Sequence, residues 1–333
     1  MQRNLRRLRR AVAISHLDQE VRQSAFFISV GLVLAIGGLA GIALSVGLDP
    51  FAGVLRHAHW QWLLVALSAT VASYAGYVLA YRETAGAEGL PLRRIGALVA
   101  GGFGVFIPRG GFALDLEALA NAGVPRARAR RRVLCLGTLE YAVLAPATFV
   151  VALILLNRHW PERLEVPLSW VIGVPLGGAI ALELLRHRES LRSARGWRER
   201  LAGGLDGIAE TMLLWRRPQY GLLAFLGMAL YWAADIAVLW ACLAVFSGQQ
   251  PGVAVIVLGY ASGYALTRRA LPLAGAGAVE VMLPFALHWM GIPLATAVVS
   301  VFAYRIFNLW LPLIPAAAGL FALKRDALAS PSA

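Results

Sequence analysis

The sequence predicts an all-α polytopic membrane protein with about six full transmembrane helices and two re-entrant helical hairpins arranged as an inverted repeat. Hydrophobic residues make up 59% of the 333 residues and charged residues only 15%, whereas soluble domains are nearer half apolar and a quarter charged. Several apolar runs exceed the roughly 18 residues that a bilayer span requires. Two other apolar regions are interrupted by proline, glycine and arginine, which are costly where they face lipid.

The net charge of +13 is explained by a membrane environment. Arginine and lysine cluster between the apolar runs, as the positive-inside rule and anionic headgroups require, so we do not expect nucleic-acid binding. This pattern predicts an integral protein of a bacterial-type inner (plasma) membrane with both termini in the cytoplasm. Cys135 and Cys242 lie inside apolar runs, where we expect buried thiols and no disulfide framework. No motif indicates a metal site, a cofactor or ATP hydrolysis.

The membrane domain is predicted to cover residues 24–325, between a basic cytoplasmic segment (residues 1–23) and a short tail (residues 326–333). Its halves meet near residue 160. Full spans are predicted at 24–48, 60–81, 133–156, 167–185 and 220–246 and after Gly291, where the apolar runs are long enough. Residues 186–218 form a cytoplasmic amphipathic segment between the fourth and fifth spans. The recurrence of Leu201, Leu205, Ile208 and Met212 at three- and four-residue spacing predicts a helix on the inner membrane face there.

The first broken region predicts a hairpin that enters the membrane from the cytoplasm and returns to it. As a helix, the apolar stretch 95–107 is about 20 Å long, against roughly 30 Å for the hydrocarbon core. It stops at Pro108-Arg109-Gly110-Gly111, and a second short helix, 112–122, ends at Gly123-Val-Pro125. Five arginines follow. A single full span would place those arginines outside, which the positive-inside rule disfavours.

The second broken region, residues 252–290, predicts a hairpin of the opposite orientation. Its first apolar run ends at Arg268 and Arg269, the chain breaks at Pro272, and a glycine-rich stretch leads to Glu280. The alternative is two full spans joined by a cytoplasmic turn at the two arginines, which gives eight full spans in total. Both topologies end in the cytoplasm, so charge counting leaves both open, and the short helix lengths favour the hairpin.

The two broken regions share one order of elements: short helix, arginine beside proline and glycine, second short helix, Gly-x-Pro, long span. Gly123-Val-Pro125 precedes the third span and Gly291-Ile-Pro293 precedes the last. Glu140 and Asn308 each lie 17 residues beyond the glycine of their turn. Repeats of opposite orientation, each with a broken helix that reaches the middle of the membrane, are the architecture of many transporters.

Arginines at the predicted hairpin tips are the candidate substrate-binding residues. Arg109 lies at one tip, Arg268 and Arg269 at the other, and Arg305 lies inside the last span. The planar guanidinium suits a phosphate, and glycine-rich helix starts add backbone donors for an anion. The structural alternative is that these arginines pair with acidic residues inside the protein, for which the candidates are Asp115, Glu117, Glu140 and Glu280.

Four acidic residues are candidates for counter-charges or proton carriers. Glu280, Glu140 and Asp235 lie inside apolar segments, and Asp115 follows the first predicted tip. A carboxylate at such a position either carries protons in a transport cycle or balances an arginine.

The broken regions resemble the transmembrane region of lysylphosphatidylglycerol synthases, whose stand-alone members are flippase-like membrane proteins. One stretch runs from Ile107-Pro-Arg-Gly-Gly111 to Glu140, the other from Leu271-Pro272 to Tyr304-Arg305. The resemblance covers about residues 20–325. The family's early acidic residue comes late here, at Asp115, and its usual Pro-Gly-Gly is Pro272-Leu-Ala-Gly275. The resemblance implies a lipid-translocating unit without the soluble aminoacyl-transferase domain.

We therefore expect a flippase that moves an anionic phospholipid or a polyprenyl-phosphate-linked lipid between leaflets, and not an enzyme. One alternative is a membrane transferase that acts on a lipid headgroup. Another is a non-catalytic partner of a separate lipid-modifying enzyme. In each case the expected partners are membrane lipids with a phosphate headgroup.

Overall fold

The computed structural model describes residues 26, 29–42, 44–45, 47, 49–56, 58–85, 89–103, 115–116, 119–120, 123–158, 164–192, 197–216, 218–247, 251–265 and 276–319. Within them, five helices are long and apolar enough to cross a membrane. These are α3 (Trp62–Glu83), α6 (Arg126–Arg158), α7 (Glu165–Arg186), most of α10 (Pro218–Phe246), and the segment Leu294–Gly319, which contains α14 (Leu294–Arg305) and the π-helical turn η4 (Ile306–Trp310). The predicted all-α polytopic membrane fold is confirmed.

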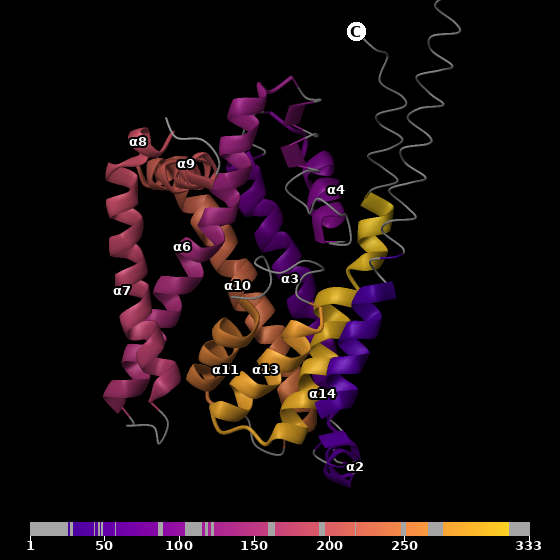
Figure 1. Ribbon diagram of the computed structural model, residues 1–333. Helices are drawn as coiled ribbons and strands as arrows, with labels where there is room; N and C mark the ends of the chain where they lie inside the picture. The colour runs from indigo at the N-terminus through magenta and orange to yellow at the C-terminus, as the bar shows by residue number, and fades with distance from the viewer. Residues whose placement is uncertain are drawn as a thin grey trace, which may run out of the picture.

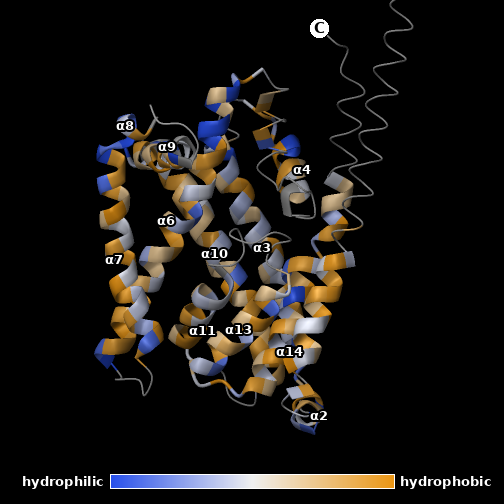
Figure 2. Cartoon of the chain, in the orientation of Figure 1, coloured by the Kyte–Doolittle hydropathy of each residue, from blue (hydrophilic) through white to orange (hydrophobic). Residues whose placement is uncertain are grey.

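Shorter helices complete the described part of the chain. They are Ser29–Ile42, α2 (Asp49–Arg56), α4 (Leu92–Phe103), α8 (Arg188–Arg192), α9 (Trp197–Trp215), α11 (Val253–Tyr260) with the π-helical turn η2 (Ala261–Ala265), and α13 (Ala278–Trp289). The long helices run side by side, with α2 at one end of the molecule and α8 and α9 at the other (Figure 1). Apolar residues dominate the middle of the long helices, and hydrophilic residues gather towards the ends (Figure 2).

Helices α3 and α10, the second span of each half, pack against each other in antiparallel directions. Near one end, the Trp62 and Trp240 rings lie 5.0 Å apart. Near the middle, the helices cross at Gly76 and Gly227. A Cβ on Gly76 would lie 2.7 Å from the Gly227 carbonyl oxygen, and a Cβ on Gly227 would lie 2.8 Å from that of Gly76. The contact is reciprocal, as expected where two equivalent helices meet on a pseudo-two-fold axis.

The Gly-x-Pro turns of the two halves have the same backbone hydrogen bonds. The amides of Gly123 and Val124 donate to the carbonyls of Ala120 and Leu119, at 3.0 Å each. In the other half, Gly291 and Ile292 donate to His288 and Leu287 at 2.9 and 3.1 Å. Both glycines have positive φ, 85° and 98°, so each turn is a Schellman helix end. A long helix follows each turn, α6 in the first half and α14 in the second, which supports the inverted repeat.

The second broken region forms two short helical arms that pack against each other. Gly263 in η2 lies against Leu283 of α13, where an added Cβ would come within 2.5 Å of the Leu283 Cα. Gly259 in α11 lies against Leu287 in the same way, with a Cβ 2.8 Å from its Cδ2. Gly259 pairs with Leu287 and Gly263 with Leu283, so the two arms run antiparallel. The described parts of the arms have 13 and 12 residues, about 20 Å each, lengths that fit the hairpin topology.

One helix boundary differs from the sequence expectation. Helix α6 begins at Arg126, seven residues before the predicted third span, because arginine is a good helix former and Pro125 fits a helix start. Its 33 residues measure about 50 Å, so its basic first turns extend past a hydrocarbon core.

A helix forms at the predicted amphipathic segment, α9, which also packs against the protein: Thr211 and Leu214 are buried, whereas Met212 is 47% exposed. The reason is protein contact, since Thr211 bonds the Cys135 carbonyl on α6.

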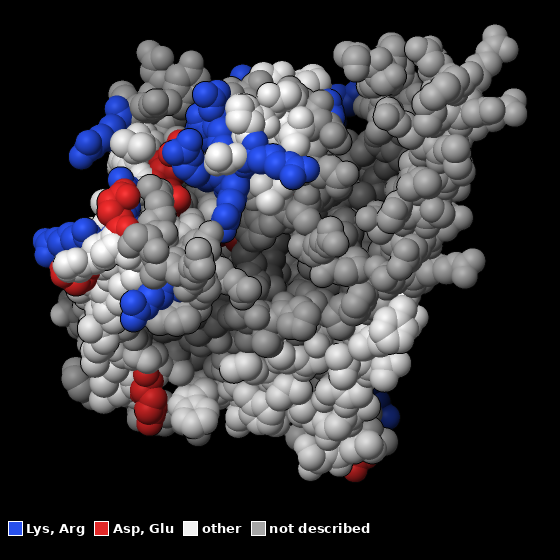
Figure 3. Space-filling view, turned by 45° about the horizontal axis from the view of Figure 1, so that its top comes forward, with Lys and Arg blue, Asp and Glu red and all other residues white. Residues whose placement is uncertain are grey.

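Basic side chains gather at the end of the molecule that holds the start of α6 together with α8 and α9. The exposed arginines of the first turns of α6 are Arg126, Arg128, Arg130 and Arg131. Figure 3 shows Lys and Arg side chains gathered on one part of the surface, interspersed with a few acidic side chains. We call this face the arginine-rich end.

Candidate functional site

A buried carboxylate on α10 joins three elements of the second half. Asp235 is 3% exposed. Its Oδ2 accepts hydrogen bonds from the hydroxyls of Tyr260 on α11 and of Tyr304 on α14, the latter at 2.9 Å. Its Oδ1 accepts from Nδ2 of Asn308 in η4 at 2.8 Å. A carboxylate inside a membrane protein is costly unless its oxygens are satisfied, and here both oxygens have donors.

The contact with Asp235 fixes the orientation of the Asn308 amide. Because Nδ2 donates to the carboxylate, Oδ1 faces the other way and serves as an acceptor. It accepts from the Tyr264 hydroxyl in η2 at 2.9 Å, and Nη1 of Arg305 lies 3.5 Å from the same oxygen. Asp235 thus orients the Asn308 oxygen that lies next to Arg305.

Arg305 is the largest of the fully buried side chains, at 1% exposure. Its Nε donates to Oε1 of Glu280 on α13 at 2.6 Å. The other Glu280 oxygen accepts from the Gly277 backbone amide at 2.7 Å, at the start of α13. Nη2 of Arg305 is buried and has no hydrogen-bond partner among the described residues. An unsatisfied charged donor is expensive in the interior, so this nitrogen is the one group of the network that invites an added acceptor.

Two residues of this network lie in π-helical turns. Tyr264 lies in η2 and Asn308 in η4, and their side chains bond to each other. Tyr260 and Tyr264 are four residues apart, as are Tyr304 and Asn308, so each pair lies on one helix face. π-Helical turns are rare and are frequent at functional sites. Two facing π turns that carry the polar contacts mark this place as specialised.

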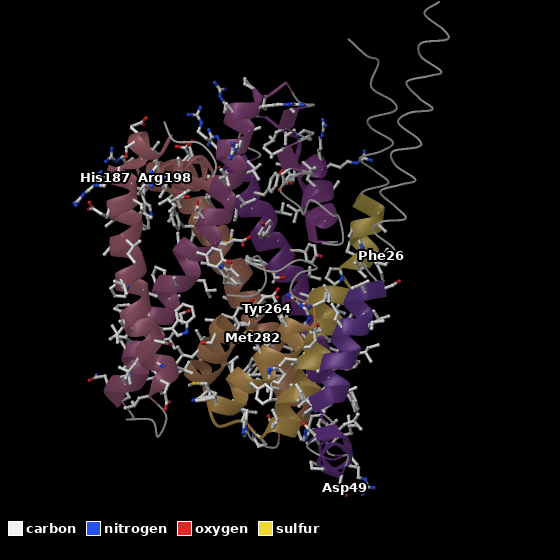
Figure 4. The ribbon with its side chains drawn as sticks, viewed as in Figure 1. Phe26, Asp49, His187, Arg198, Tyr264 and Met282 are labelled. Atoms are coloured by element: carbon white, nitrogen blue, oxygen red, sulfur yellow. The ribbon has the colours of Figure 1, made fainter. Side chains whose placement is uncertain are left out.

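The network lies deep in the membrane-spanning part of the molecule. Tyr264 is near the middle of the view in Figure 4, between Asp49 at one end and His187 and Arg198 at the other. Met282, from the second arm of the hairpin, lies close to it in the same view. A charged cluster at this depth is the position at which transporters bind substrates and coupling ions.

Aromatic side chains connect this network to Glu140 on α6. Nε1 of Trp232 donates to the backbone oxygen of Glu140 at 2.8 Å. The Trp232 ring packs edge-on against Tyr260, with centroids 6.0 Å apart. Glu140 is 1% exposed. Trp232 and Tyr260 link its backbone to Asp235.

Asp115 contacts the end of α3. Its Oδ1 accepts from the Tyr81 hydroxyl at the end of α3 at 3.0 Å. Ring contacts run from Tyr77, also on α3, to Tyr231 and on to Trp232. The structure therefore brings together Asp235, Glu280 and Arg305, with Glu140 nearby, whereas Asp115 bonds to Tyr81.

Arg109, Arg268 and Arg269 lie outside the described residues, as does Glu117. The residues that sequence reasoning missed are neutral: Tyr260, Tyr264, Tyr304 and Asn308. Their signal was the four-residue spacing of polar side chains inside apolar runs. Within the described part of the chain, no group of three or more His, Cys, Asp and Glu side chains is placed to hold a metal ion.

Replacing Asp235 by asparagine tests the role of this carboxylate. Asparagine has one acceptor oxygen for three donors, so at least one donor loses its partner and the cost is about 1–3 kcal/mol. We expect thermal unfolding of the detergent-solubilised protein, followed by tryptophan fluorescence, to shift downwards. The matched control is Asp49→Asn on the exposed helix α2, which we expect to be neutral. Equal stability of the two variants would contradict the assignment.

A comparison with protein-family models matches residues 26–316 to the family described as lysylphosphatidylglycerol synthase TM region. A search among curated proteins gave no match. The matched range includes every described residue of the buried network.

Proposed function

Because the chain belongs to the family of lysylphosphatidylglycerol synthase transmembrane regions, we propose that it moves an anionic lipid between the leaflets of a membrane. The family and the apolar helices establish an integral membrane protein tied to lipid handling. The substrate class that we propose is a phospholipid or polyprenyl lipid with a phosphate in its headgroup.

The observation that carries the proposal is Nη2 of Arg305. It is buried and has no partner within the described ranges, beside the start of α13, where Gly277 and Glu280 lie. Helix N-termini favour anions, and a guanidinium forms charge-assisted hydrogen bonds with phosphate oxygens. A phosphate oxygen in contact with Nη2 would satisfy a donor that the described residues leave open.

The inverted repeat supports transport over anchoring. Two halves of opposite orientation give a protein two alternative access routes to one central site. In this proposal Arg109 and the pair Arg268 and Arg269 receive the headgroup at the two tips predicted from the sequence and pass it to Arg305. The arginine-rich end faces the cytoplasm, in keeping with the positive-inside rule.

The test is lipid movement by the purified full chain in liposomes. Labelled phosphatidylglycerol, its aminoacylated form and a polyprenyl-phosphate sugar are added to one leaflet, and their exposure on the other is followed by quenching with a membrane-impermeant reductant. We expect movement of at least one of them. Arg305→Lys keeps the charge and loses the guanidinium fork. We therefore expect the rate of lipid movement to fall by at least about tenfold, which is equivalent to the loss of one charge-assisted hydrogen bond.

The matched control is Arg186→Lys on the exposed end of α7, where the arginine side chain is 76% exposed. This control is expected to move lipid at the unchanged rate. Arg109→Ala and Arg268→Ala report on the hairpin tips. If Arg305→Lys leaves lipid movement unchanged, Arg305 is not the binding site, and the transport activity itself still holds. Protein that moves none of the lipids, with or without a proton gradient, would contradict transport and favour a transferase or a partner role.

A further inference from the structure

Glu280 occupies the place that an anionic ligand would take. One of its oxygens receives the Nε hydrogen of Arg305 at 2.6 Å, and the other receives the backbone amide of Gly277 at 2.7 Å. A guanidinium and the start of a helix are the same two groups that bind phosphate in proteins. The carboxylate is completely buried, so both donors are saturated by an internal anion.

Exchange of this internal anion for a phosphate has a charge consequence. A displaced Glu280 cannot remain ionised, because an unpaired carboxylate at this depth costs several kcal/mol. Replacement of the carboxylate by one phosphodiester charge, with uptake of one proton by Glu280, keeps the net charge of the site constant. The proton leaves the acid form of the buffer, whose bond to that hydrogen breaks, and forms an O–H bond on a Glu280 carboxyl oxygen.

We propose that Glu280 is a resident substitute for the lipid phosphate and that binding of the phosphate displaces it and protonates it. This inference rests on the proposed function, and it adds the coupling of one proton to each anion bound. The partly filled guanidinium provides the entry point: the phosphate first meets the open Nη2 and then takes over Nε and the helix start.

The described elements around Glu280 carry few titratable groups. The helix Ser29–Ile42 packs over the start of α13 at Gly38, whose added Cβ would lie 3.8 Å from that of Glu280, and this helix has no titratable side chain. Among the described residues, the titratable groups on the other elements around α13 are Arg305 and Tyr304 on α14, Tyr264 on η2, Tyr260 on α11 and, through the tyrosines, Asp235 on α10. On α13 itself, His288 bonds the Ile292 carbonyl.

Asp235 does not fit the same role. Its two oxygens receive three hydrogen bonds from neutral donors, and none of these donors is a group that a phosphate would claim in this scheme. Asp235 therefore positions Asn308, and Glu280 is the carboxylate that changes state in this proposal.

The experiment is calorimetric titration of the detergent-solubilised full chain with dihexanoyl-phosphatidylglycerol in buffers of low and high ionisation enthalpy. The difference between the binding heats measured in the two buffers gives the number of protons taken up for each lipid bound. We expect about one proton per lipid bound and an affinity that falls up to tenfold for each pH unit of increase, because protonation favours the bound state. Glycerol 3-phosphate, which lacks acyl chains, is the second ligand, and equally tight binding of it would point to a free phosphate ester as the substrate.

Glu280→Gln separates this inference from the proposed function. Glutamine can still accept from Gly277 at the helix start, but it leaves Arg305 without an anion. We expect lipid binding that is tighter than in the wild type, independent of pH and without proton uptake, together with a thermal stability that the lipid restores. Glu183→Gln, a change on the exposed surface of α7, should leave proton uptake unchanged.

Each result is decisive. Anionic lipid that binds the wild type without proton uptake, or binds Glu280→Gln with the wild-type pH dependence, would overturn the exchange and leave the proposed function in place. Wild-type protein that binds none of the anionic lipids would overturn both. If Glu280→Gln does not fold, the proton count of the wild type alone decides.

Discussion

Arg305→Gln is expected to abolish lipid movement and to lower stability by about 3–5 kcal/mol, because it leaves the buried Glu280 carboxylate without its partner. The side chains of Arg305 and Glu280 are 1% and 0% exposed, and their N–O distance is 2.6 Å. Thermal unfolding in detergent and transport in liposomes would be measured on the same preparation.

The double variant Arg305→Gln, Glu280→Gln separates the two effects. Both charges are removed, and neutral amides can bond to each other, so most of the lost stability is expected to return. Transport is expected to remain absent, because the phosphate-binding guanidinium is missing. A double variant that transports at the wild-type rate would show that the ion pair serves the fold alone.

Gly76→Ala is expected to destabilise the protein by about 1–3 kcal/mol through overpacking at the crossing of α3 and α10. The added Cβ would lie 2.6 Å from the Tyr231 amide nitrogen and 2.7 Å from the Gly227 oxygen. Both are backbone atoms, which cannot rotate away as a side chain can. The two helices must therefore move apart, and with them the pseudo-two-fold contact between the halves.

The control for this prediction is Gly177→Ala on α7, where nothing lies within 4 Å of an added Cβ. Alanine is the better helix former by up to about 1 kcal/mol, so this variant is expected to be neutral or slightly more stable. Thermal unfolding of both variants in one detergent checks the pair. A stabilised Gly76→Ala variant would show that the crossing is looser than the structure describes.

The sequence predicted the fold class because membrane insertion depends on local properties. Run length, arginine distribution and breaks at proline and glycine are all readable along the chain. For that reason the second, fourth and fifth spans agree with α3, α7 and α10 to within about three residues at each end. Asp235, Glu140, Glu280 and Arg305 were identified in the same way, as charges inside apolar segments.

Partners, by contrast, depend on contacts between distant segments. Glu280 and Arg305 are 25 residues apart, and Asn308 and Asp235 are 73 apart. No local pattern states that Glu280 binds Arg305 while Asp235 binds two tyrosines and an amide. The sequence left pairing and phosphate binding as alternatives for the arginines. In the described part of the chain, Arg305 is paired at Nε and Nη2 has no partner.

The sequence by itself determined a helical membrane protein with two broken regions in repeated order, since hydropathy and backbone chemistry fix which segments can span a bilayer. The tertiary structure decided the rest. Close approach at Gly76 and Gly227 joins the halves, contacts at Gly259 and Gly263 close the hairpin, and burial decides which charges neutralise each other. These outcomes depend on distances between helices, which no stretch of sequence contains.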